Sequence, residues 1–325
     1  MAEIAQPSPD AGPSSPSTSS SPSTVAVAGA GGDLGGRIVR ALLDRGAAVR
    51  LLVNPAADPA RTEHLVARGA TRVPVDVSES GESTAALADA LTGTDAVVSA
   101  WNGLREVIVD RQSRLVDAAV AAGVRRFIPS DYCLDWTRTR LGDNRNIDLR
   151  REFAGRADRA PIATTSVLVG AFTDLLTGPM PVLQPRLKRV LYWVDADQPL
   201  NFTTRDDTAA VTADVALSAQ DTPRFVRFAG DTLTARDLAR VSGEIAGVPY
   251  RLSSAGGLRV LSGMIVAAQV LDRSRDAVFP AWQGMQYLRD MFTGRGALQD
   301  LDNARFRIDP TGVDAFLRAW EADAA

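Results

Sequence analysis

The feature that most constrains this fold is a short apolar run, residues 24–28, followed at once by a glycine-dense turn and an amphipathic helix. Leu34, Ile38 and Leu42 recur at helical spacing, so one face of that helix is apolar. A second apolar run, residues 49–53, completes the unit. Glycine lets such a turn close tightly and keeps Cβ atoms away from a ligand, while the helix start aims free N–H groups at it. A glycine turn in this βαβ setting predicts a dinucleotide-binding site.

Composition excludes several classes of protein. The net charge of −3 and the pI near 5.4 give no basic footprint, so we expect no nucleic-acid partner. Cys133 and His64 are the only residues of their kinds, which argues against an intrachain disulfide, a zinc site and a Ser-His-Asp triad, and we expect no metal. No apolar run reaches the roughly 18 to 20 residues that span a bilayer, and the Ser/Pro-rich residues 1–23 lack the pattern of a signal peptide. We therefore expect a soluble, cytoplasmic protein with a disordered tail and no membrane contact.

Strand and helix patterns alternate with short connections over the first half of the chain. Further strands are expected over residues 71–75, 95–100, 124–129 and 164–169. This alternation predicts an α/β fold with a doubly wound parallel Rossmann sheet. We place an NAD(P)-binding Rossmann domain at residues 24–175, with later strands completing its sheet. After a cluster of prolines, residues 176–325 are expected to form a smaller α+β carboxy-terminal lobe that binds the substrate.

In a doubly wound sheet, ligands bind at the carboxyl ends of the strands. The residues at or soon after each predicted strand end are therefore the candidates for cofactor binding. They are Gly29, Gly31, Gly32, Asp33, Leu34, Gly35, Asn54, Arg61, Asp76, Ala100, Trp101, Asn102, Ser130 and Gly170. Trp101 suits stacking on the cofactor or lining a pocket, although large aromatic side chains more often serve packing alone.

The end of the second predicted strand bears on the choice of cofactor. Folds that prefer NAD usually place Asp or Glu there to hold the ribose hydroxyls, whereas this chain has Asn54. Arg37 and Arg61 lie near in the sequence, and an uncharged residue beside arginines tolerates a 2′-phosphate. We therefore predict a modest preference for NADP(H) over NAD(H).

Several motifs occur in an order that resembles one protein family. They are the Gly-Ala-Gly-Gly-Asp-Leu-Gly turn at 29–35, Gln112 to Tyr132, Thr165 to Phe172, Tyr192 to Gln198 with Asp206-Asp207, and Gly230 to Ala239. On these motifs the chain resembles the NmrA-like and isoflavone reductase-like proteins, which are atypical short-chain dehydrogenase/reductases. The resemblance implies an NAD(P)-binding Rossmann domain with a small carboxy-terminal lobe. It implies either a reductase or a catalytically silent redox sensor, because the family includes both.

The chain departs from the catalytic pair that is usual in this superfamily. A typical short-chain dehydrogenase uses Tyr-x-x-x-Lys, and no such motif exists here, since Lys188 is the only lysine. By the resemblance, the lysine of isoflavone reductase-like proteins falls close to Arg150. Arginine stays protonated at neutral pH, so it can orient or neutralise an anion but is a poor proton donor. Arg150 is therefore a candidate catalytic residue, and a solvated helix arginine is the equally weighted alternative.

Asp131 and Tyr132 follow the fifth predicted strand, where the resemblance places residues beside the nicotinamide. A partly desolvated carboxylate there would have a raised pKa and act as an acid, although a loop aspartate that caps a turn is at least as common. Both residues are candidates for the proton donor. Aromatic residues suited to a substrate pocket, each with core packing as its default role, are Trp136, Phe172, Tyr192 and Trp193.

Two hypotheses from different classes follow. The first is an NAD(P)H-dependent oxidoreductase that reduces a small-molecule substrate, an aromatic or carbonyl-bearing metabolite. The second is a non-catalytic redox sensor whose NAD(P) occupancy changes its surface for a regulatory protein partner, and the missing Tyr/Lys pair favours it. An apolar pocket beside a cofactor is the default active site, so we favour the enzyme. A homodimer is compatible with both hypotheses.

Overall fold

The computed structural model describes residues 22–78, 80–274 and 276–324, so residues 1–21 of the predicted tail lie outside the described residues. Its centre is a six-stranded parallel sheet with the strand order β3-β2-β1-β4-β5-β6. The strands are β1 (Thr24–Ala28), β2 (Ala48–Val53), β3 (Thr71–Pro74), β4 (Ala96–Ser99), β5 (Arg126–Ile128) and β6 (Ala163–Thr164). This order is that of a doubly wound dinucleotide-binding fold, and the predicted Rossmann sheet is confirmed.

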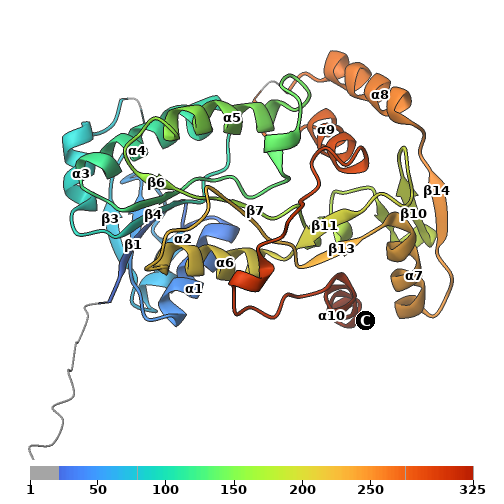
Figure 1. Cartoon of the computed structure of the whole chain (residues 1–325), viewed down its shortest axis with the longest axis horizontal. Coiled ribbons are helices and arrows are strands. Elements are labelled where there is room, and N and C mark those ends of the chain that lie inside the picture. Colours follow the sequence, from blue (N-terminus) through green and yellow to red (C-terminus); the bar gives the residue numbers. More distant parts are fainter. Residues whose placement is uncertain (1–21, 79, 275, 325) are drawn as a thin grey trace, which may run out of the picture.

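Helices cover both faces of the sheet (Figure 1). The helices α1 and α6 pack against each other on one face, whereas α3, α4 and α5 lie on the other. The helices are α1 (Asp33–Asp44), α2 (Ala60–Val66), α3 (Thr84–Leu91), α4 (Gln112–Ala121), α5 (Arg145–Ala157) and α6 (Arg205–Leu217). A π-helical segment, η1 (Glu106–Arg111), leads directly into α4, so the long helix expected there begins with a different winding.

The central strand β1 shows why these residues form a sheet that is covered on both sides. Val25 and Val27 join the core beneath α1 and α6, whereas Ala26 and Ala28 join the core beneath α3, α4 and α5. Successive side chains of a strand point to opposite faces, so an uninterrupted apolar run fits a strand that is buried on both faces. The strand β1 lies between two parallel neighbours, β2 and β4. Its carboxyl end leads into the glycine turn, at the edge of the sheet where ligands bind in this fold.

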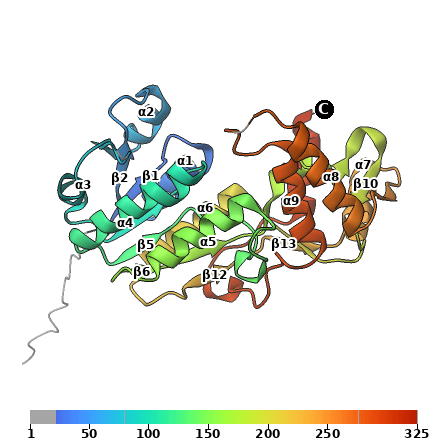
Figure 2. The same cartoon turned by 90° about the horizontal axis from the view of Figure 1, so that it is seen from above.

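The remaining chain forms a second lobe with its own core, which lies beside the sheet in Figure 2. Its helices are α7 (Ala235–Ala246), α8 (Leu258–Leu271), α9 (Ala281–Phe292) and α10 (Val313–Ala324). Its short strands are β8 (Ala171–Phe172), β9 (Leu183–Gln184), β10 (Arg189–Tyr192), β11 (Leu200–Thr203), β13 (Asp231–Leu233) and β14 (Arg251–Ser254). Two further strands, β7 (Ser166–Leu168) and β12 (Phe225–Arg227), contribute instead to the core beneath α1 and α6. Single 3₁₀ turns, η2 to η5, lie at Trp136–Arg138, Thr173–Thr177, Pro185–Leu187 and Asn303–Arg305.

Two elements from beyond residue 175 return to the sheet region. The helix α6 packs on α1, and β12 pairs in parallel with β7, which follows β6 after one residue. Later segments thus complete the layers around the first half of the chain. In the described part of the chain, no helix has the length and apolar character that crossing a membrane requires.

Candidate cofactor and active site

The glycine turn connects β1 to α1 and packs closely on its neighbours. Gly29 has φ +85°, and a Cβ atom there would lie 2.8 Å from the carbonyl oxygen of Ala100 at the end of β4. A Cβ atom on Gly35 would collide with the Gly29 carbonyl. Gly32 differs, because its φ is −89° and a Cβ atom would meet only the Gly29 oxygen, at 3.3 Å. Gly29 and Gly35 thus serve the packing of the turn, whereas Gly32 borders open space.

The start of α1 keeps its N–H groups available. Gly32 is the N-cap and makes no side-chain capping bond, so the cap consumes none of the first-turn donors. The Asp33 carboxylate forms ion pairs with Arg37, at 2.8 Å, and with Arg205 of α6, at 3.3 Å. Arg205 also pairs with Asp174, at the start of the second lobe. A glycine turn with open donors and the positive end of a helix dipole fits an anionic phosphate group.

One of the two nearby arginines lies on this turn. Arg61 of α2 donates from Nη2 to the Gly31 carbonyl at 3.3 Å, and a Cβ atom on Gly31 would touch the Arg61 side chain at 3.4 Å. Arg37 instead bonds to Asp33 and, at 2.6 Å, to Asp206. Arg61 is therefore the cation that borders the turn, while Arg37 is engaged by two carboxylates.

The other predicted cofactor residues at the ends of β2 and β3 lie in tight turns. Asn54 is exposed, and its side-chain oxygen accepts a bond from the Ala56 N–H at 2.8 Å. Asp76 accepts a bond from the Ser78 N–H at 2.9 Å, and this bond lowers the pKa of Asp76. Leu34, in the first turn of α1, packs on the core beneath α1 and α6.

The ends of β4 and β5 are tied together at the same edge of the sheet. The Ser130 hydroxyl donates to the carbonyl oxygen of Trp101 at 2.5 Å, and the Ser130 N–H donates to Gln112 at 3.0 Å. The Trp101 ring would meet a Cβ atom on Gly29 at 3.1 Å, and Asn102 is exposed beside it. The structure thus brings residues after β1, β4 and β5 together, as the parallel topology requires. Gln112, fully buried, was missed by sequence reasoning.

Asp131 and Arg150 are both buried in the interior, close enough for the guanidinium to influence the carboxyl group. Asp131 is fully buried, and its Oδ2 accepts a bond from the Ser166 hydroxyl at 2.6 Å, whereas its Oδ1 has no hydrogen-bond partner among the described residues. Burial raises the pKa of Asp131, and the Arg150 guanidinium offsets part of that rise. Arg150 lies on the inner face of α5 at 7% exposure, so the solvated alternative is wrong. Its Nη1 donates to the Asn146 carbonyl at 2.9 Å, and its Nε has no partner in the described chain.

Tyr132 lies on the opposite side of the sheet from Asp131. Its side chain is buried in the core beneath α1 and α6, and its hydroxyl faces Thr212 of α6. Burial raises the pKa of this phenol well above its ordinary value. The aromatic hydroxyl that the structure does place near Arg150 belongs to Tyr287 of α9, which no local pattern marked as part of a site.

A buried polar network fixes α9 on the start of α5. Asn144, the N-cap of α5, donates to Asp290 at 3.0 Å and accepts a bond from Gln283 at 2.7 Å. The N–H of Arg145 donates to Gln286 at 3.1 Å. Sequence reasoning missed this network, although polar residues at helical spacing on the otherwise apolar side of α9 were a usable signal. The network holds the helix that carries Arg150.

We expect Asp290 to make stability depend on pH. Burial raises the pKa of Asp290 from 3.8 to about 6, so its contribution to stability is full below pH 3.8 and is lost as the pH rises through 6. Relative to an Asp290→Asn variant, the wild type should lose up to about 3 kcal/mol of unfolding free energy between about pH 4 and 7. Urea denaturation over this range measures the difference, with exposed Asp314→Asn as the control. A wild type that keeps or gains unfolding free energy relative to Asp290→Asn as the pH rises would contradict the expectation.

Two of the four predicted pocket aromatics, Trp136 and Trp193, lie in the packed cores. Trp136 stacks edge-on against Phe225 with ring centres 5.3 Å apart, and Trp193 packs against Phe292 at 5.7 Å. Tyr192 borders the core of the second lobe. Phe172 lies closest to the glycine turn, because Arg205, the partner of Asp33, stacks on its ring at 5.0 Å.

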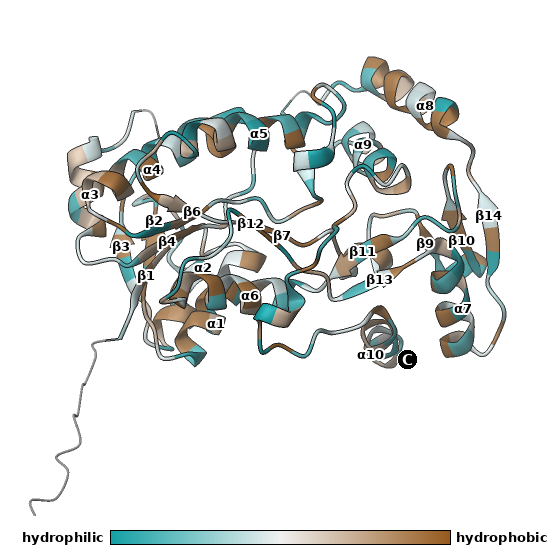
Figure 3. Ribbon diagram, in the orientation of Figure 1, coloured by the Kyte–Doolittle hydropathy of each residue, from teal (hydrophilic) through white to brown (hydrophobic). Residues whose placement is uncertain are grey.

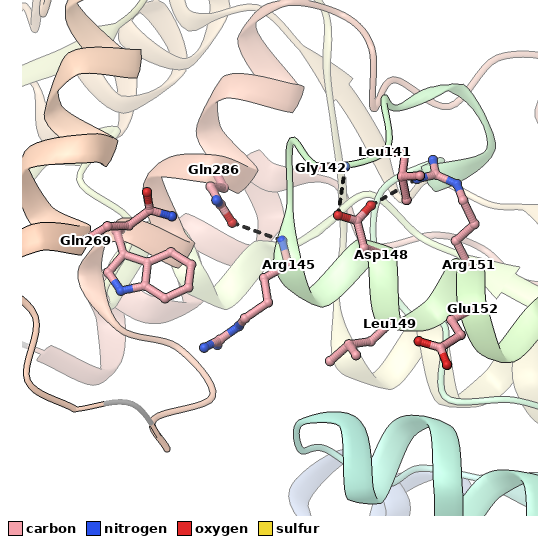
Figure 4. A pocket seen from close by; sticks show the side chains of 10 residues that line it. Leu141, Gly142, Arg145, Asp148, Leu149, Arg151, Glu152, Gln269 and Gln286 are labelled. Atoms are coloured by element: carbon pink, nitrogen blue, oxygen red, sulfur yellow. Dashed lines mark hydrogen bonds and ion pairs between the residues drawn. The ribbon is translucent and has the colours of Figure 1, made fainter.

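The backbone packs so closely around Gly170 that no side chain fits there. Gly170 has φ +70°, and a Cβ atom there would collide with the carbonyl of Asn201 in β11. A cavity of about 680 Å³ lies elsewhere, between α5, α8 and α9 (Figure 4). One of its walls is formed by the Arg145 guanidinium, which lies over the Trp282 ring at 4.6 Å from the ring centre. None of the predicted site residues lines this cavity. Among the residues that the structure describes, no group of three or more His, Cys, Asp or Glu side chains could hold a metal ion.

The fold and the glycine turn define a Rossmann-type α/β protein with a second lobe. The model of the NmrA-like family matches residues 21–271, and the chain belongs to this family. It is 30% identical over 224 residues to the bifunctional pinoresinol-lariciresinol reductase of Linum album, and 27% identical over 184 residues to an NmrA-like family domain-containing oxidoreductase of Gibberella moniliformis. These matches cover 64% and 54% of this chain, and 66% and 58% of the length of those curated relatives.

A solved structure, AtPrR2 with NADP+ and (+)pinoresinol, matches the fold over most of both chains. The match has a TM-score of 0.78 at 20% identity and covers 93% of this chain and 99% of that one. The similarity therefore extends through the second lobe as well as the Rossmann sheet.

Proposed function

We propose that this protein is an NADP(H)-dependent reductase of a small aromatic or carbonyl-bearing metabolite. The observation that carries the proposal is the burial of two charged residues, Asp131 directly after β5 and Arg150 on the inner face of α5, each of which keeps a polar atom without a partner among the described residues. Buried charged groups without partners are costly, and they concentrate at functional sites. The names of the relatives, a bifunctional pinoresinol-lariciresinol reductase and a complex with NADP+ and (+)pinoresinol, support the same class.

The residues present fit the cofactor. The open N–H groups at the start of α1 would hold the pyrophosphate, with Gly32 leaving room for it, and Arg61 would hold a 2′-phosphate. The exposed Asn54 presents no carboxylate to repel that phosphate. NADPH, when bound, supplies a hydride to the substrate.

Asp131 and Arg150 would then serve the substrate. With its pKa raised by burial, Asp131 can hold a proton on Oδ1 and deliver it to the substrate, while the Ser166 hydroxyl steadies Oδ2. The guanidinium of Arg150 stays protonated and would neutralise negative charge that develops on a substrate oxygen. The two roles need different groups, because a permanent cation is a poor proton donor.

We expect Arg61→Ala to weaken NADPH binding about tenfold and to leave NADH binding within about twofold, because only NADPH carries the phosphate that Arg61 would pair with. Calorimetric titration with both cofactors measures the two dissociation constants. Arg68→Ala is the control, since this exposed arginine, just beyond α2, pairs with Asp44 instead. Equal losses for both cofactors would contradict the role in 2′-phosphate binding, and tighter binding of NADH by the wild type would contradict the NADP(H) preference.

A second candidate function, a non-catalytic redox sensor, has one observation in its favour. The site offers no usual acid pair, because Tyr132 lies in the core beneath α6 and the only lysine, Lys188, stacks on Tyr250 in the second lobe. A sensor needs the cofactor turn but no proton donor. Cofactor binding would change the surface of the protein, and a regulatory protein partner would bind only one of the two surface states.

The oxidation of NADPH across a panel of enones, quinones and phenylpropanoids tests the proposal. Turnover of any panel member above the rate without enzyme supports a reductase. Tight NADPH binding without turnover of any of them would favour the sensor. If calorimetry shows no binding of either NADPH or NADH, both functions are wrong.

A further inference from the structure

The helix α8 presents an apolar face to the outside of the molecule. In Figure 3 it lies at the outer edge of the second lobe and is largely coloured as hydrophobic. Only Leu261 and Ile265 are buried, and they join the core of the second lobe together with residues of α9. Five exposed large apolar side chains on one side of the helix are here called the α8 stripe: Val260 (52% exposed), Met264 (40%), Val266 (58%), Val270 (79%) and Leu271 (78%). Leu258 is also exposed but lies outside this arc.

The α8 stripe covers one side of the helix and is interrupted by Arg259, an exposed residue that falls inside its arc near the amino-terminal end. At 100° per residue its five side chains occupy an arc of roughly 160°, with exposed Gly263 and Ala267 at the centre. A Cβ atom on Gly263 would meet nothing within 4 Å, so this centre is open. Large exposed apolar patches on soluble proteins mark interaction sites, because water is expelled from them on binding.

We propose that the α8 stripe is a dimer interface, formed by two copies of this chain that pair their α8 helices antiparallel about a twofold axis. A twofold interface uses the same patch on both subunits, so the patch must complement itself. An apolar stripe with small residues at its centre meets this condition, since two helices can approach closely at Gly263 and Ala267 and bury the flanking valines. The interface is independent of the proposed reaction.

Charge complementarity sets the direction of the pair. Arg259 is the only charged residue within α8, and the last turn of the helix carries no basic residue. Antiparallel pairing places Arg259 beside Leu271 of the partner subunit, at the carboxyl end of that helix, where the dipole favours a cation. Parallel pairing would instead bring the two Arg259 side chains together. In the antiparallel pair, Gly263 lies level with Ala267 of the partner subunit.

The size and charge of the stripe favour a second copy over a lipid surface. Five large apolar side chains exposed to this degree offer roughly 500 Å², a large part of the about 800 Å² that each partner buries in a standard interface. Helices that lie on membranes usually carry several Lys or Arg residues on their polar face. The face of α8 opposite to the stripe is instead packed on the second lobe through Leu261 and Ile265.

Light scattering coupled to size-exclusion chromatography tests the proposal on the full chain. The wild type should be a dimer, and Val270→Asp should raise the dimer dissociation constant by about 30-fold or more, because a carboxylate is then buried on both copies. Leu187→Asp is the control, because Leu187 is an exposed apolar residue of the same lobe outside the stripe, and this variant should stay dimeric. Circular dichroism and the melting temperature establish that each variant is folded.

A monomeric wild type, or a Val270→Asp variant that remains as dimeric as the wild type, would overturn the proposal. A wild-type monomer that sediments with vesicles of phosphatidylserine and phosphatidylcholine, while Val270→Asp does not, would assign the stripe to a membrane surface.

Cysteine cross-linking tests the direction of the pair. A mixture of Gly263→Cys and Ala267→Cys subunits should form a disulfide-linked dimer on mild oxidation, because these positions face each other across the antiparallel pair. The native Cys133 is buried and takes no part. Each variant alone should link much less. Efficient linking of each variant alone would indicate parallel helices and contradict the antiparallel arrangement.

Discussion

Gly32→Val is expected to lower the affinity for NADP(H) at least about 100-fold and to leave the protein folded. The backbone at Gly32 has φ −89°, which any residue adopts, and the side chain would project from the start of α1 into open space. Its only close neighbour is the Gly29 oxygen, at 3.3 Å, so the turn needs to yield by a few tenths of an ångström. A branched side chain there would occupy the place where first-turn N–H groups would meet a phosphate. Calorimetry and the melting temperature measure the two effects.

Gly35→Val separates loss of the site from loss of the fold. A Cβ atom on Gly35 collides with the Gly29 carbonyl, so this variant should lose stability as well as binding. Gly32→Val is thus expected to lose cofactor binding alone, whereas Gly35→Val is expected to lose binding because the fold is destabilised. If Gly32→Val binds NADPH as the wild type does, the turn does not hold the cofactor.

Arg150→Met should lower kcat/KM by about 100-fold and change the dissociation constant of NADPH by less than about threefold. The substitution keeps an apolar stem in a buried position but removes the cation that would neutralise charge on the substrate oxygen. Arg150→Lys keeps a positive charge and should retain a larger share of turnover. Arg156→Met, an exposed arginine of the same helix, is the control. Loss of cofactor affinity equal to the loss of turnover would indicate a structural role.

The same variant gives a pH signature. Arg150 lowers the pKa of Asp131, so its removal should raise that pKa further. If Asp131 delivers the proton, the alkaline limb of the kcat/KM profile moves to higher pH in Arg150→Met. A profile with an unshifted limb would mean that Asp131 is not the proton donor.

The arrangement of the sheet followed from local patterns. The apolar run at 24–28 became β1 without change, and the run at 49–53 became β2 (Ala48–Val53). The run at 164–169 was different, because it divides into β6, which pairs with β5, and β7, which pairs with β12. That division depends on a partner about sixty residues further along the chain, and no local periodicity carries this information.

The candidate site shows the same contrast between local and distant information. Asp131 and Tyr132 are adjacent, and side chains of an extended segment alternate between faces, so they could not both face one site. The structure places Asp131 toward α5 and Tyr132 toward α6. Tyr287 and Asp290 reach the same region from more than 130 residues away, and only the packing of α9 on α5 reveals them.

The docking of α9 on α5 also determines when the protein can become complete during its synthesis. Asn144 leaves the ribosome 146 residues before Asp290, its hydrogen-bond partner, and Arg126 leaves it 89 residues before Val215, whose carbonyl its guanidinium binds in the interior. A nascent chain that ends near residue 175 also lacks α6 and therefore leaves uncovered the apolar surfaces of α1, β4 and β5 on which that helix packs. The first half of the chain therefore cannot bury all of its apolar surface until the second half has been synthesised. A fragment containing only residues 24–175 would keep that exposure permanently, and the binding turn is best studied in the full-length protein.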